Sequence, residues 1–256
     1  MNSASILLSV VTITRNNPDG LARTVESAAA LRGWGVEHIV VDGSDGQYTP
    51  QNTVCCSRAG VRYIYREPEG ISDAFNFGLS EAHGEWIWFV NGGDAIHELL
   101  EPSWLLGLLS KSGAAITTGG IHYDGEPQIR YAPMLSDRWP LLSCWFPHPA
   151  TLVRRNLLVA VGGFDLRYAI AMDYDLWLRL AHQGVLVDVI SMPFARFDLG
   201  GVSNQVHART QLLREESRII LEQWKHLLRQ NAQMTFRVAG RLLRALRHQF
   251  TQSTNL

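Results

Sequence analysis

Three short polar clusters, each following an apolar run, carry side chains that could bind a nucleotide diphosphate. They are Thr-Arg-Asn at 14–16, Asp-Gly-Ser-Asp at 42–45 and Asn-Gly-Gly-Asp at 91–94. A carboxylate can accept a hydrogen bond from a nucleobase or a ribose hydroxyl, or hold a divalent cation that bridges to phosphate. Asp and Gly also form ordinary turns after strands, and for any single cluster that explanation is equally good.

The segments around these clusters alternate between strand-like and helix-like patterns. Apolar, β-rich runs predict strands at 6–13, 36–41, 61–65 and 86–90, and helical spacing of apolar residues is clearest at 72–83. Strands separated by helices of this length predict an α/β fold with a parallel sheet. Because ligands bind beyond the carboxyl ends of such strands, we expect the three clusters to converge on one cleft.

Periodic patterns return in the second half of the chain. A helix is predicted at 173–182 and a strand at 185–190. Two amphipathic helices are expected further on, at about 207–230 and 234–250.

The charge of the chain is divided between two parts. We expect an α/β domain over 1–206 and a basic, amphipathic helical tail over 207–256. Residues 209–256 carry a net charge of +6 and residues 1–208 carry -7, which leaves -1 for the whole chain. A global nucleic-acid footprint is therefore absent, and we expect no nucleic-acid partner.

Composition limits the class and the compartment. The 256 residues are 46% hydrophobic and 18% charged, which excludes general disorder. The cysteines Cys55, Cys56 and Cys144 are odd in number and lack a metal-binding spacing, which favours a reducing compartment. No apolar stretch reaches the about 18 residues that span a bilayer, so we expect a cytoplasmic protein, not an integral membrane protein.

A series of short motifs covers roughly residues 6 to 205. The motifs stand at 9–17, 40–46, 67–78, 89–94, 148–151, 162–165, 172–179 and 197–203. In order and spacing the set resembles the family-two glycosyltransferases. The pattern Asp73-Ala-x-Asn76-x-Gly78, together with the end at 91–94, is similar to the branch that includes the colanic-acid transferases of bacterial exopolysaccharide synthesis.

This resemblance implies a fold and an activity. The fold would be GT-A, which has a Rossmann-like, mostly parallel central sheet flanked by helices. The activity would be inverting transfer of a sugar from a UDP- or GDP-sugar to a saccharide acceptor, lipid-linked, in bacterial surface polysaccharide synthesis. The enzyme would then work at the inner face of the cytoplasmic membrane.

The resemblance also implies a set of nucleotide-binding residues: Thr14, Arg15, Asn16, Asp42, Asp73 and Asn76. Of these, Thr14 and Arg15 match the pair beside the nucleobase, and Asp42 matches the Asp that accepts a hydrogen bond from a uracil-type imide. Asp73 and Asn76 match the helix that faces the pyrophosphate.

Two further residues match the chemistry of transfer. Asp173 matches the catalytic base, and Asp94 matches the last Asp of the metal-binding turn. Inverting transfer needs a base that takes the proton of the acceptor hydroxyl. It also needs positive charge on the departing diphosphate, usually from a metal ion, so we expect Mg²⁺ or Mn²⁺ as cofactor.

The chain departs from the family pattern at three positions. Gly93 stands where many relatives have a carboxylate, Met172 stands where Glu is common, and Arg15 replaces an aromatic residue. Mg²⁺ tolerates a site with one or two carboxylates. Gly93 and Met172 nevertheless motivate a second hypothesis, a catalytically silent nucleotide-sugar-binding scaffold protein, which would bind nucleotide without releasing it from a donor.

Two side chains are candidates for binding the acceptor. His148, in a proline-flanked turn, could bind the acceptor or the leaving phosphate, and it could equally be a structural histidine. Trp145 lies in a loop-like stretch, where an aromatic ring could form a platform for a sugar.

We predict that residues 207–250 form a peripheral membrane anchor through the second helix. The alternative is that both helices pack on the catalytic domain, and we favour packing for the first helix, because its three Glu residues dilute its positive charge. The stretch 234–250 carries an apolar stripe opposite Arg237, Arg241, Arg244 and Arg247, and it has no acidic residue. Such a helix suits an anionic bilayer surface, where each basic side chain contributes about 1 kcal/mol. The full chain should co-sediment with anionic vesicles but not with neutral ones, and a chain truncated after Asn231 should not. If the full chain also stays in the supernatant at low salt, the tail is not an anchor.

Overall fold

The N-terminal half of the sheet consists of four parallel strands. The computed structural model describes residues 6–132, 146–200 and 208–222. Its first strands are β1 (Leu8–Thr14), β2 (Val36–Asp42), β3 (Arg62–Tyr65) and β4 (Trp86–Phe89), in the spatial order β3-β2-β1-β4. β1 and β4 are buried along almost their whole length, as expected for parallel strands covered on both faces. The four strands predicted from the apolar runs are confirmed.

The register of these strands brings the three polar clusters to one edge of the sheet. Thr14 stands opposite Asp42 in the β1–β2 ladder. Gly43 N donates to Thr14 O at 3.0 Å, and Gly92 N donates to Ile13 O at 2.9 Å. The turn after β4 therefore joins the ends of β1 and β2, and the expected convergence is confirmed.

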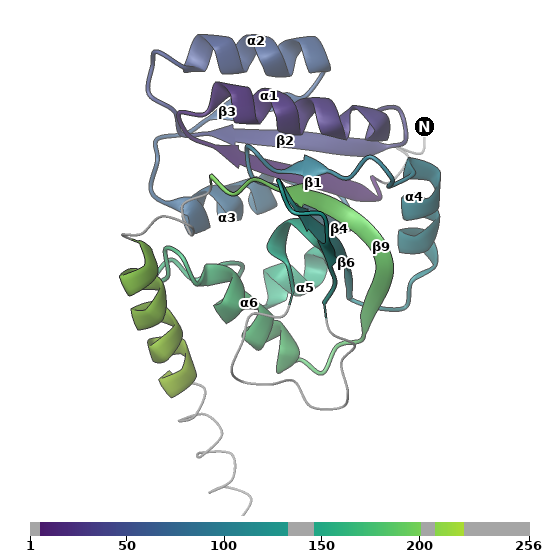
Figure 1. The fold of residues 1–256 in the computed structure, drawn as a ribbon, viewed down its shortest axis with the longest axis vertical. Coiled ribbons are helices and arrows are strands. Elements are labelled where there is room, and N and C mark those ends of the chain that lie inside the picture. Colours follow the sequence, from purple (N-terminus) through teal and green to yellow (C-terminus); the bar gives the residue numbers. More distant parts are fainter. Residues whose placement is uncertain (1–5, 133–145, 201–207, 223–256) are drawn as a thin grey trace, which may run out of the picture. The chain divides into compact units, whose positions relative to one another are not determined.

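Three helices cover this half of the sheet: α1 (Pro18–Ser27), α2 (Thr49–Ala59) and α3 (Ile71–Glu81). Figure 1 shows α1 and α2 on one side of β1 and β2, with α3 on the other side. Asn17 caps α1 by accepting a hydrogen bond from Gly20 N at 3.0 Å, next to a proline in the first turn. The sequence pattern missed α2, because only Asn52 and Cys56 of this helix are buried.

The C-terminal half adds strands of both directions to the same sheet. They are β5 (Ala95–Ile96), β6 (Ile116–Tyr123), β7 (Ile129–Arg130), β8 (Thr151–Arg154) and β9 (Val187–Phe197). The full order is β3-β2-β1-β4-β8-β6-β9-β5, with β7 beside β6, and β8 runs antiparallel to both of its neighbours. The sheet is therefore mixed, and the expected parallel arrangement applies to β1 through β4. A short buried apolar run does not reveal its direction, so the sequence could not specify that of β8.

β9 is longer than the strand predicted at 185–190 because it pairs with two other strands. It runs parallel to β6, and its last residues run antiparallel to β5, where Arg196 stands opposite Ala95. The register against β6 shifts on both sides of Gly120, and such irregularities bend a strand. In Figure 1, β9 curves around the sheet so that its end returns to the turn after β4.

The other helices are α4 (Pro102–Lys111), α5 (Arg155–Ala160) and α6 (Met172–Ala181), with 3-10 turns at Ala28–Leu31 and His148–Ala150. The helix predicted at 173–182 is confirmed as α6. Leu176, Trp177 and Leu180 of this helix are buried, and its N-terminus carries Asp173.

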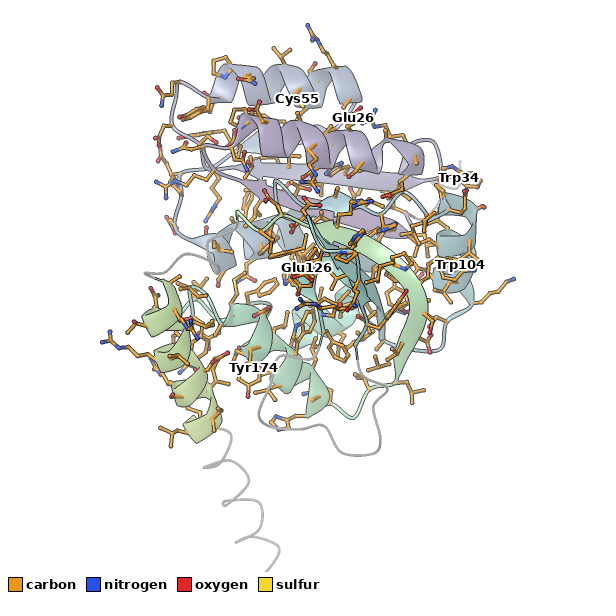
Figure 2. The ribbon with its side chains drawn as sticks, in the orientation of Figure 1. Glu26, Trp34, Cys55, Trp104, Glu126 and Tyr174 are labelled. Carbon is orange, nitrogen blue, oxygen red and sulfur yellow. The ribbon has the colours of Figure 1, made fainter. Side chains whose placement is uncertain are left out.

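Large aromatic side chains fill the core beneath the site. Trp86 and Trp88 are fully buried, whereas Trp34 and Trp104 are 52% and 39% exposed and lie on the surface (Figure 2). Cys55 and Cys56 are free thiols, and Cys144 lies outside the described residues, so the expected reducing compartment stays a prediction.

The chain divides into two compact units, Met1–Leu213 and Arg214–Leu256. The predicted boundary between a domain over 1–206 and a tail over 207–256 stays a prediction. Residues 208–222 form a helix, whereas the helix expected at 234–250 lies outside the described residues. Among the described helices, none is long and apolar enough to cross a membrane.

We predict that Gly78 is required for the packing of α3 on β1. A Cβ atom at Gly78 would overlap the Val11 side chain, whereas a Cβ atom at Gly107 in α4 would meet no atom within 4 Å. Gly78→Ala should lower the free energy of unfolding by about 1–3 kcal/mol. The control Gly107→Ala should raise it by about 0.5–1 kcal/mol, because alanine is the better helix former. Urea denaturation measures both, and equal effects would contradict the packing argument.

Candidate functional site

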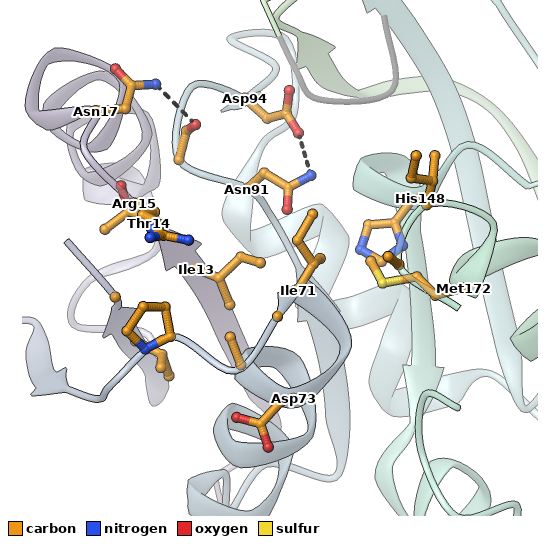
Figure 3. Close-up of a pocket in the computed structure, with 18 of the residues that line it drawn as sticks. Ile13, Thr14, Arg15, Asn17, Ile71, Asp73, Asn91, Asp94, His148 and Met172 are labelled. Carbon is orange, nitrogen blue, oxygen red and sulfur yellow. Dashed lines mark hydrogen bonds between the residues drawn. The ribbon is translucent and has the colours of Figure 1, made fainter. Parts of the chain in front are cut away.

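A cavity of about 580 Å³ opens at the carboxyl edge of the parallel strands. Its lining includes the ends of β1 and β2, the turn after β4, the N-termini of α3 and α6, and the end of β9. Figure 3 shows Thr14 and Arg15 on one side and His148 and Met172 on the other. Of the predicted site residues, those on the lining are Thr14, Arg15, Asp73, Asp94, His148 and Asp173.

Asp42 is not on the lining. Its side chain is fully buried, its Oδ1 accepts from Ser44 N at 2.8 Å, and its Oδ2 accepts from Asn52 Nδ2 at 2.8 Å and from the Tyr63 hydroxyl at 2.7 Å. Asp42 therefore stabilises the loop after β2 from the side that faces away from the cavity. Gly43 is the residue of that loop that lines the cavity.

Asn16 is exposed and joins two of the polar clusters. It adopts a left-handed backbone conformation with φ at 53°, which Asn tolerates better than most residues. Asn16 N donates to Ser44 Oγ at 2.7 Å, its Nδ2 donates to Asp45 Oδ2 at 2.9 Å, and Asp45 N donates to its Oδ1 at 2.8 Å. Its side chain is not on the lining, so its contribution in this structure is to fix the loop that carries Arg15.

Asn76 is also outside the lining and acts as a clamp. Its Nδ2 donates to Phe164 O and its Oδ1 accepts from Phe164 N, both at 2.8 Å. The clamp holds the turn at 162–165, where Gly163 has a positive φ of 68° and a Cβ atom would overlap the Asn76 amide. Asn76 therefore positions the segment that leads to α6.

Asp175 supports the same turn from α6. Its carboxylate accepts from Arg179 Nε at 2.7 Å, and the Arg179 guanidinium also donates to the carbonyl oxygens of Val161 and Gly163. Asp175 is therefore engaged in the packing of α6, and Asp173 is the carboxylate of this helix on the cavity lining.

Arg66 is a lining residue that the sequence analysis missed. It forms a bidentate pair with Asp73, with distances of 2.8 Å from Nε to Oδ2 and 3.1 Å from Nη2 to Oδ1, and it stacks over Phe77 at 4.6 Å. The hydrogen bond to Asp73 raises the pKa of Arg66 above its usual range. A carboxylate cannot bind pyrophosphate directly, so Asp73 orients the cation that can.

Asp94 is 3% exposed and stands at the end of the turn after β4. Its Oδ1 accepts from Asp198 N at 3.0 Å and its Oδ2 accepts from Asn91 Nδ2 at 3.3 Å (Figure 3). Burial raises the pKa of Asp94 to about 7, and the neighbouring Asp198 charge acts in the same direction. The Thr24 hydroxyl braces the turn by donating to Asp94 O at 2.6 Å and accepting from Gly93 N at 3.0 Å.

Asp198, at the end of β9, is a second lining residue that the sequence analysis did not select. A Cβ atom at Gly93 would lie 2.8 Å from Asp198 Oδ2. Asp198 follows directly after a strand, and the same position after a strand marked the three polar clusters in the sequence. The predicted strand ended at 190, so that signal was not used.

His148 is buried in an aromatic surrounding on the cavity wall. The ring centroids of Phe75, Phe89, Phe164 and Trp177 lie 5.1, 5.9, 5.8 and 6.3 Å from that of His148. Neither ring nitrogen has a hydrogen-bond partner among the described residues. Burial lowers the pKa of His148 to about 4, so the imidazole is neutral at pH 7. Trp145, the other predicted acceptor-binding residue, lies outside the described residues.

Asp173 follows Met172 at the N-terminus of α6, and both residues line the cavity. Tyr174 N donates to Asp173 Oδ1 at 2.7 Å. The Met172 sulfur accepts a hydrogen bond from Ser72 Oγ at 3.1 Å, which ties α6 to the first turn of α3. The neighbour of Asp173 is thus a buried thioether, where relatives commonly carry a second carboxylate.

The fold is that of GT-A-like glycosyltransferases. The S. aureus TarS 1–349 structure in complex with UDP superposes with a TM-score of 0.65 at 17% sequence identity, covering 84% of this chain and 64% of that one. The mannosyltransferase PcManGT from Pyrobaculum calidifontis, in complex with GDP-Man and Mn²⁺, gives a TM-score of 0.55 at 16% identity over 75% of this chain and 57% of that one. A longer TarS chain is covered over 36% of its length. The expected fold class is confirmed.

The chain belongs to glycosyl transferase family 2, whose profile matches residues 9–172. An uncharacterized glycosyltransferase of Mycobacterium tuberculosis is 34% identical over 180 residues, which is 68% of each chain. A PGL/p-HBAD biosynthesis glycosyltransferase of the same organism is 23% identical over 210 residues, covering 79% of this chain and 81% of the relative.

We predict that His148 makes the protein less stable in acid. A histidine whose pKa falls from about 6.5 to about 4 on folding stabilises the native state above pH 6.5, and this stability is lost as the pH falls toward 4. At about 1.4 kcal/mol per pH unit, the loss between pH 7 and pH 5 is roughly 2 kcal/mol. His148→Phe should remove that part of the slope in urea denaturation at the two pH values. An unchanged slope would show that His148 does not titrate as a buried group.

Buried His38 provides the matched control for this measurement. Burial lowers its pKa to about 4 as well, but it lies away from the cavity, beside Thr12 in the sheet. His38 also makes the free energy of unfolding fall as the pH falls. Part of this pH dependence should therefore persist in His148→Phe and should decrease further when His38 is also replaced.

Proposed function

We propose that the chain is an inverting glycosyltransferase that moves a sugar from a UDP- or GDP-sugar to a hydroxyl group of a saccharide acceptor. The observation that carries this proposal is the presence of Asp94 and Asp173 on the lining of one cavity. Inverting transfer needs a base for the acceptor hydroxyl and compensation for the charge on the leaving diphosphate. One carboxylate is available for each task, at the end of a strand and at the start of a helix.

The ligands of the structural neighbours support a nucleotide-sugar donor. TarS structures contain UDP or UDP-GlcNAc, and the PcManGT structure contains GDP-Man with Mn²⁺. The volume of this cavity, about 580 Å³, lies within the range of small-ligand sites.

Arg66 and the N-terminus of α3 are the groups best suited to the diphosphate. The guanidinium is held by Asp73 on the cavity lining, and the free N–H groups at a helix start attract anions. Arg15 would stack its guanidinium plane on the nucleobase. The expected hydrogen bond from Asp42 to the nucleobase stays a prediction, and Gly43 is the neighbour that faces the cavity.

The oxygen atoms around the turn at 91–94 fit Mg²⁺ or Mn²⁺. Asp94 lines the cavity beside Thr14, whose buried hydroxyl has no hydrogen-bond partner among the described residues. The residues that the structure describes contain no group of three or more His, Cys, Asp or Glu that could hold a metal ion. A cation that keeps waters and phosphate oxygens in its shell needs only one or two carboxylates. When bound, it would neutralise the charge that develops on the departing diphosphate.

Asp173 would take the proton of the acceptor hydroxyl. Its backbone lies in the first turn of α6, and the hydrogen bond from Tyr174 N fixes the orientation of Oδ1. The clamp formed by Asn76 and the pairing of Asp175 with Arg179 hold the segment before this helix. These contacts would keep the base in place relative to the donor bound at the sheet edge.

The acceptor would enter on the side of His148. A neutral imidazole with two open nitrogens can donate to one sugar oxygen and accept from a hydroxyl. We further propose that the acceptor is lipid-linked, with Trp145 as a stacking surface, and that the enzyme serves bacterial surface polysaccharide synthesis at the inner face of the cytoplasmic membrane.

The second candidate is the silent nucleotide-sugar-binding scaffold, which Gly93 and Met172 favour. Turnover separates the two functions. An active enzyme releases UDP or GDP from a nucleotide sugar in the presence of acceptor, whereas a silent relative binds the nucleotide and releases none.

We predict that Asp173→Asn lowers transfer by about 10²–10⁴-fold, because the acceptor hydroxyl loses its base. Thermal stability and UDP binding should stay close to those of the parent protein. The control is Asp19→Asn, since Asp19 is likewise the second residue of a helix, α1, but is exposed away from the lining. Nucleotide release at saturating acceptor measures the effect. Parental activity in Asp173→Asn would overturn the assignment of the base.

A further inference from the structure

The turn after β4 has a glycine, Gly93, beside the buried Asp94. Gly93 adopts a φ of 118°, which residues with a side chain rarely adopt. A Cβ atom placed there would lie 2.8 Å from Asp198 Oδ2 and 3.5 Å from Asp198 Cβ. The space beside Gly93 is therefore filled by a carboxylate that comes from residue 198.

The fold fixes Asp198 at this place from two directions. The ladder between β5 and β9, with Ala95 opposite Arg196, brings the end of β9 to the turn. Asp198 N then donates to Asp94 Oδ1 at 3.0 Å, and Gly200 N donates to Asp198 Oδ1 at 2.9 Å. The position of this carboxylate thus depends on sheet pairing and local hydrogen bonds.

The two carboxylates form an electrostatic problem that a cation would solve. Asp94 is 3% exposed, and its Oδ1 accepts a hydrogen bond of 3.0 Å from the backbone N–H of Asp198, so the two carboxylate side chains come from neighbouring positions. The Arg23 guanidinium is engaged with Asp124 at 2.5 Å. Adjacent like charges in a buried place are costly unless a positive charge binds between or beside them.

A separate observation also points to a ligand at this place. Thr14 is 8% exposed and lines the same cavity, and its Oγ1 has no hydrogen-bond partner among the described residues. A Cβ atom at Gly92, in the same turn, would lie 2.9 Å from that hydroxyl oxygen. A buried hydroxyl without a partner is costly, and a cation or a cation-bound water would satisfy it.

We propose that Asp198 supplies the carboxylate that Gly93 lacks, so that Asp94 and Asp198 together hold the divalent cation of this site. The inference deepens the proposed function and rests on it for the identity of the nucleotide. Two carboxylates, one from the turn after β4 and one from the end of β9, together with a hydroxyl on the same cavity lining, meet the needs of an octahedral cation that keeps several waters.

The test measures metal binding directly on the full chain. Mn²⁺ is titrated into the protein with and without UDP, and free Mn²⁺ is read by electron paramagnetic resonance. Asp198→Asn should weaken Mn²⁺ binding by at least about tenfold, since the loss of an outer-shell partner alone already costs that much. Asp94→Asn should weaken it likewise, and Asp198→Glu should be intermediate because it keeps the charge.

The matched control is Asp188→Asn, which removes one negative charge from the opposite end of β9, where Asp188 pairs with Ser112. This variant should bind Mn²⁺ as the parent does, and melting temperatures identify any variant that fails to fold. Parental Mn²⁺ affinity in folded Asp198→Asn, or no Mn²⁺ binding by the parent with or without UDP, would overturn the inference.

The design separates this inference from the proposed function. Mn²⁺ binding that depends on both Asp94 and Asp198, without transfer from any UDP- or GDP-sugar, would support the cation site and refute the enzyme. Transfer that persists in chelator and in Asp198→Asn would support the enzyme and refute the cation site.

Discussion

The antiparallel ladder between β9 and β5 is the interaction on which the site depends. β1 to β4 alone bring Thr14, Gly43 and Asp94 to one edge of the sheet. The curved β9 returns the chain to this edge, where Asp198 N bonds to the Asp94 carboxylate. Without that return, the Asp94 carboxylate would lose the hydrogen bond from Asp198 N and gain access to water, and the cavity would lose one wall.

A second set of contacts joins Asp173, the proposed base, to the parallel strands. Asn76 of α3 clamps Phe164 through two hydrogen bonds, and Arg179 of α6 holds the carbonyl oxygens of Val161 and Gly163. Because α3 packs directly on β1 and β2, its bonds to Phe164 fix the position of α6 relative to the parallel strands. The family resemblance places Asn76 at the pyrophosphate. In this structure its side chain bonds the backbone of Phe164.

The sequence predicted what depends on local patterns. Buried apolar runs identified β1 to β4, and the turn residues after them identified the edge where the cavity lies. The family resemblance selected Asp42, whose hydrogen bond to the nucleobase stays a prediction, and no local pattern indicated that the adjacent Gly43 lines the cavity. Asp198 was missed because the predicted strand ended at 190, whereas pairing with distant strands extends β9 to Phe197. Arg66 was missed because its place depends on a side-chain pair with Asp73. Such long-range geometry leaves no periodic signal in the chain.

The balance of charge on the cavity lining supports the proposed cation. Among the residues that the structure describes, six on the lining are acidic, namely Glu67, Glu69, Asp73, Asp94, Asp173 and Asp198, whereas the basic ones are Arg15 and Arg66. Arg66 is already paired with Asp73, and His148 is neutral at pH 7 because burial lowers its pKa. An anionic diphosphate would be repelled from such a wall unless a cation enters with it. A wall of fixed cations could hold the diphosphate instead, but it would make any nearby carboxylate a weaker base. The proposed divalent cation at the strand ends would neutralise the diphosphate and, because it is exchangeable, would not lower the basicity of Asp173 permanently.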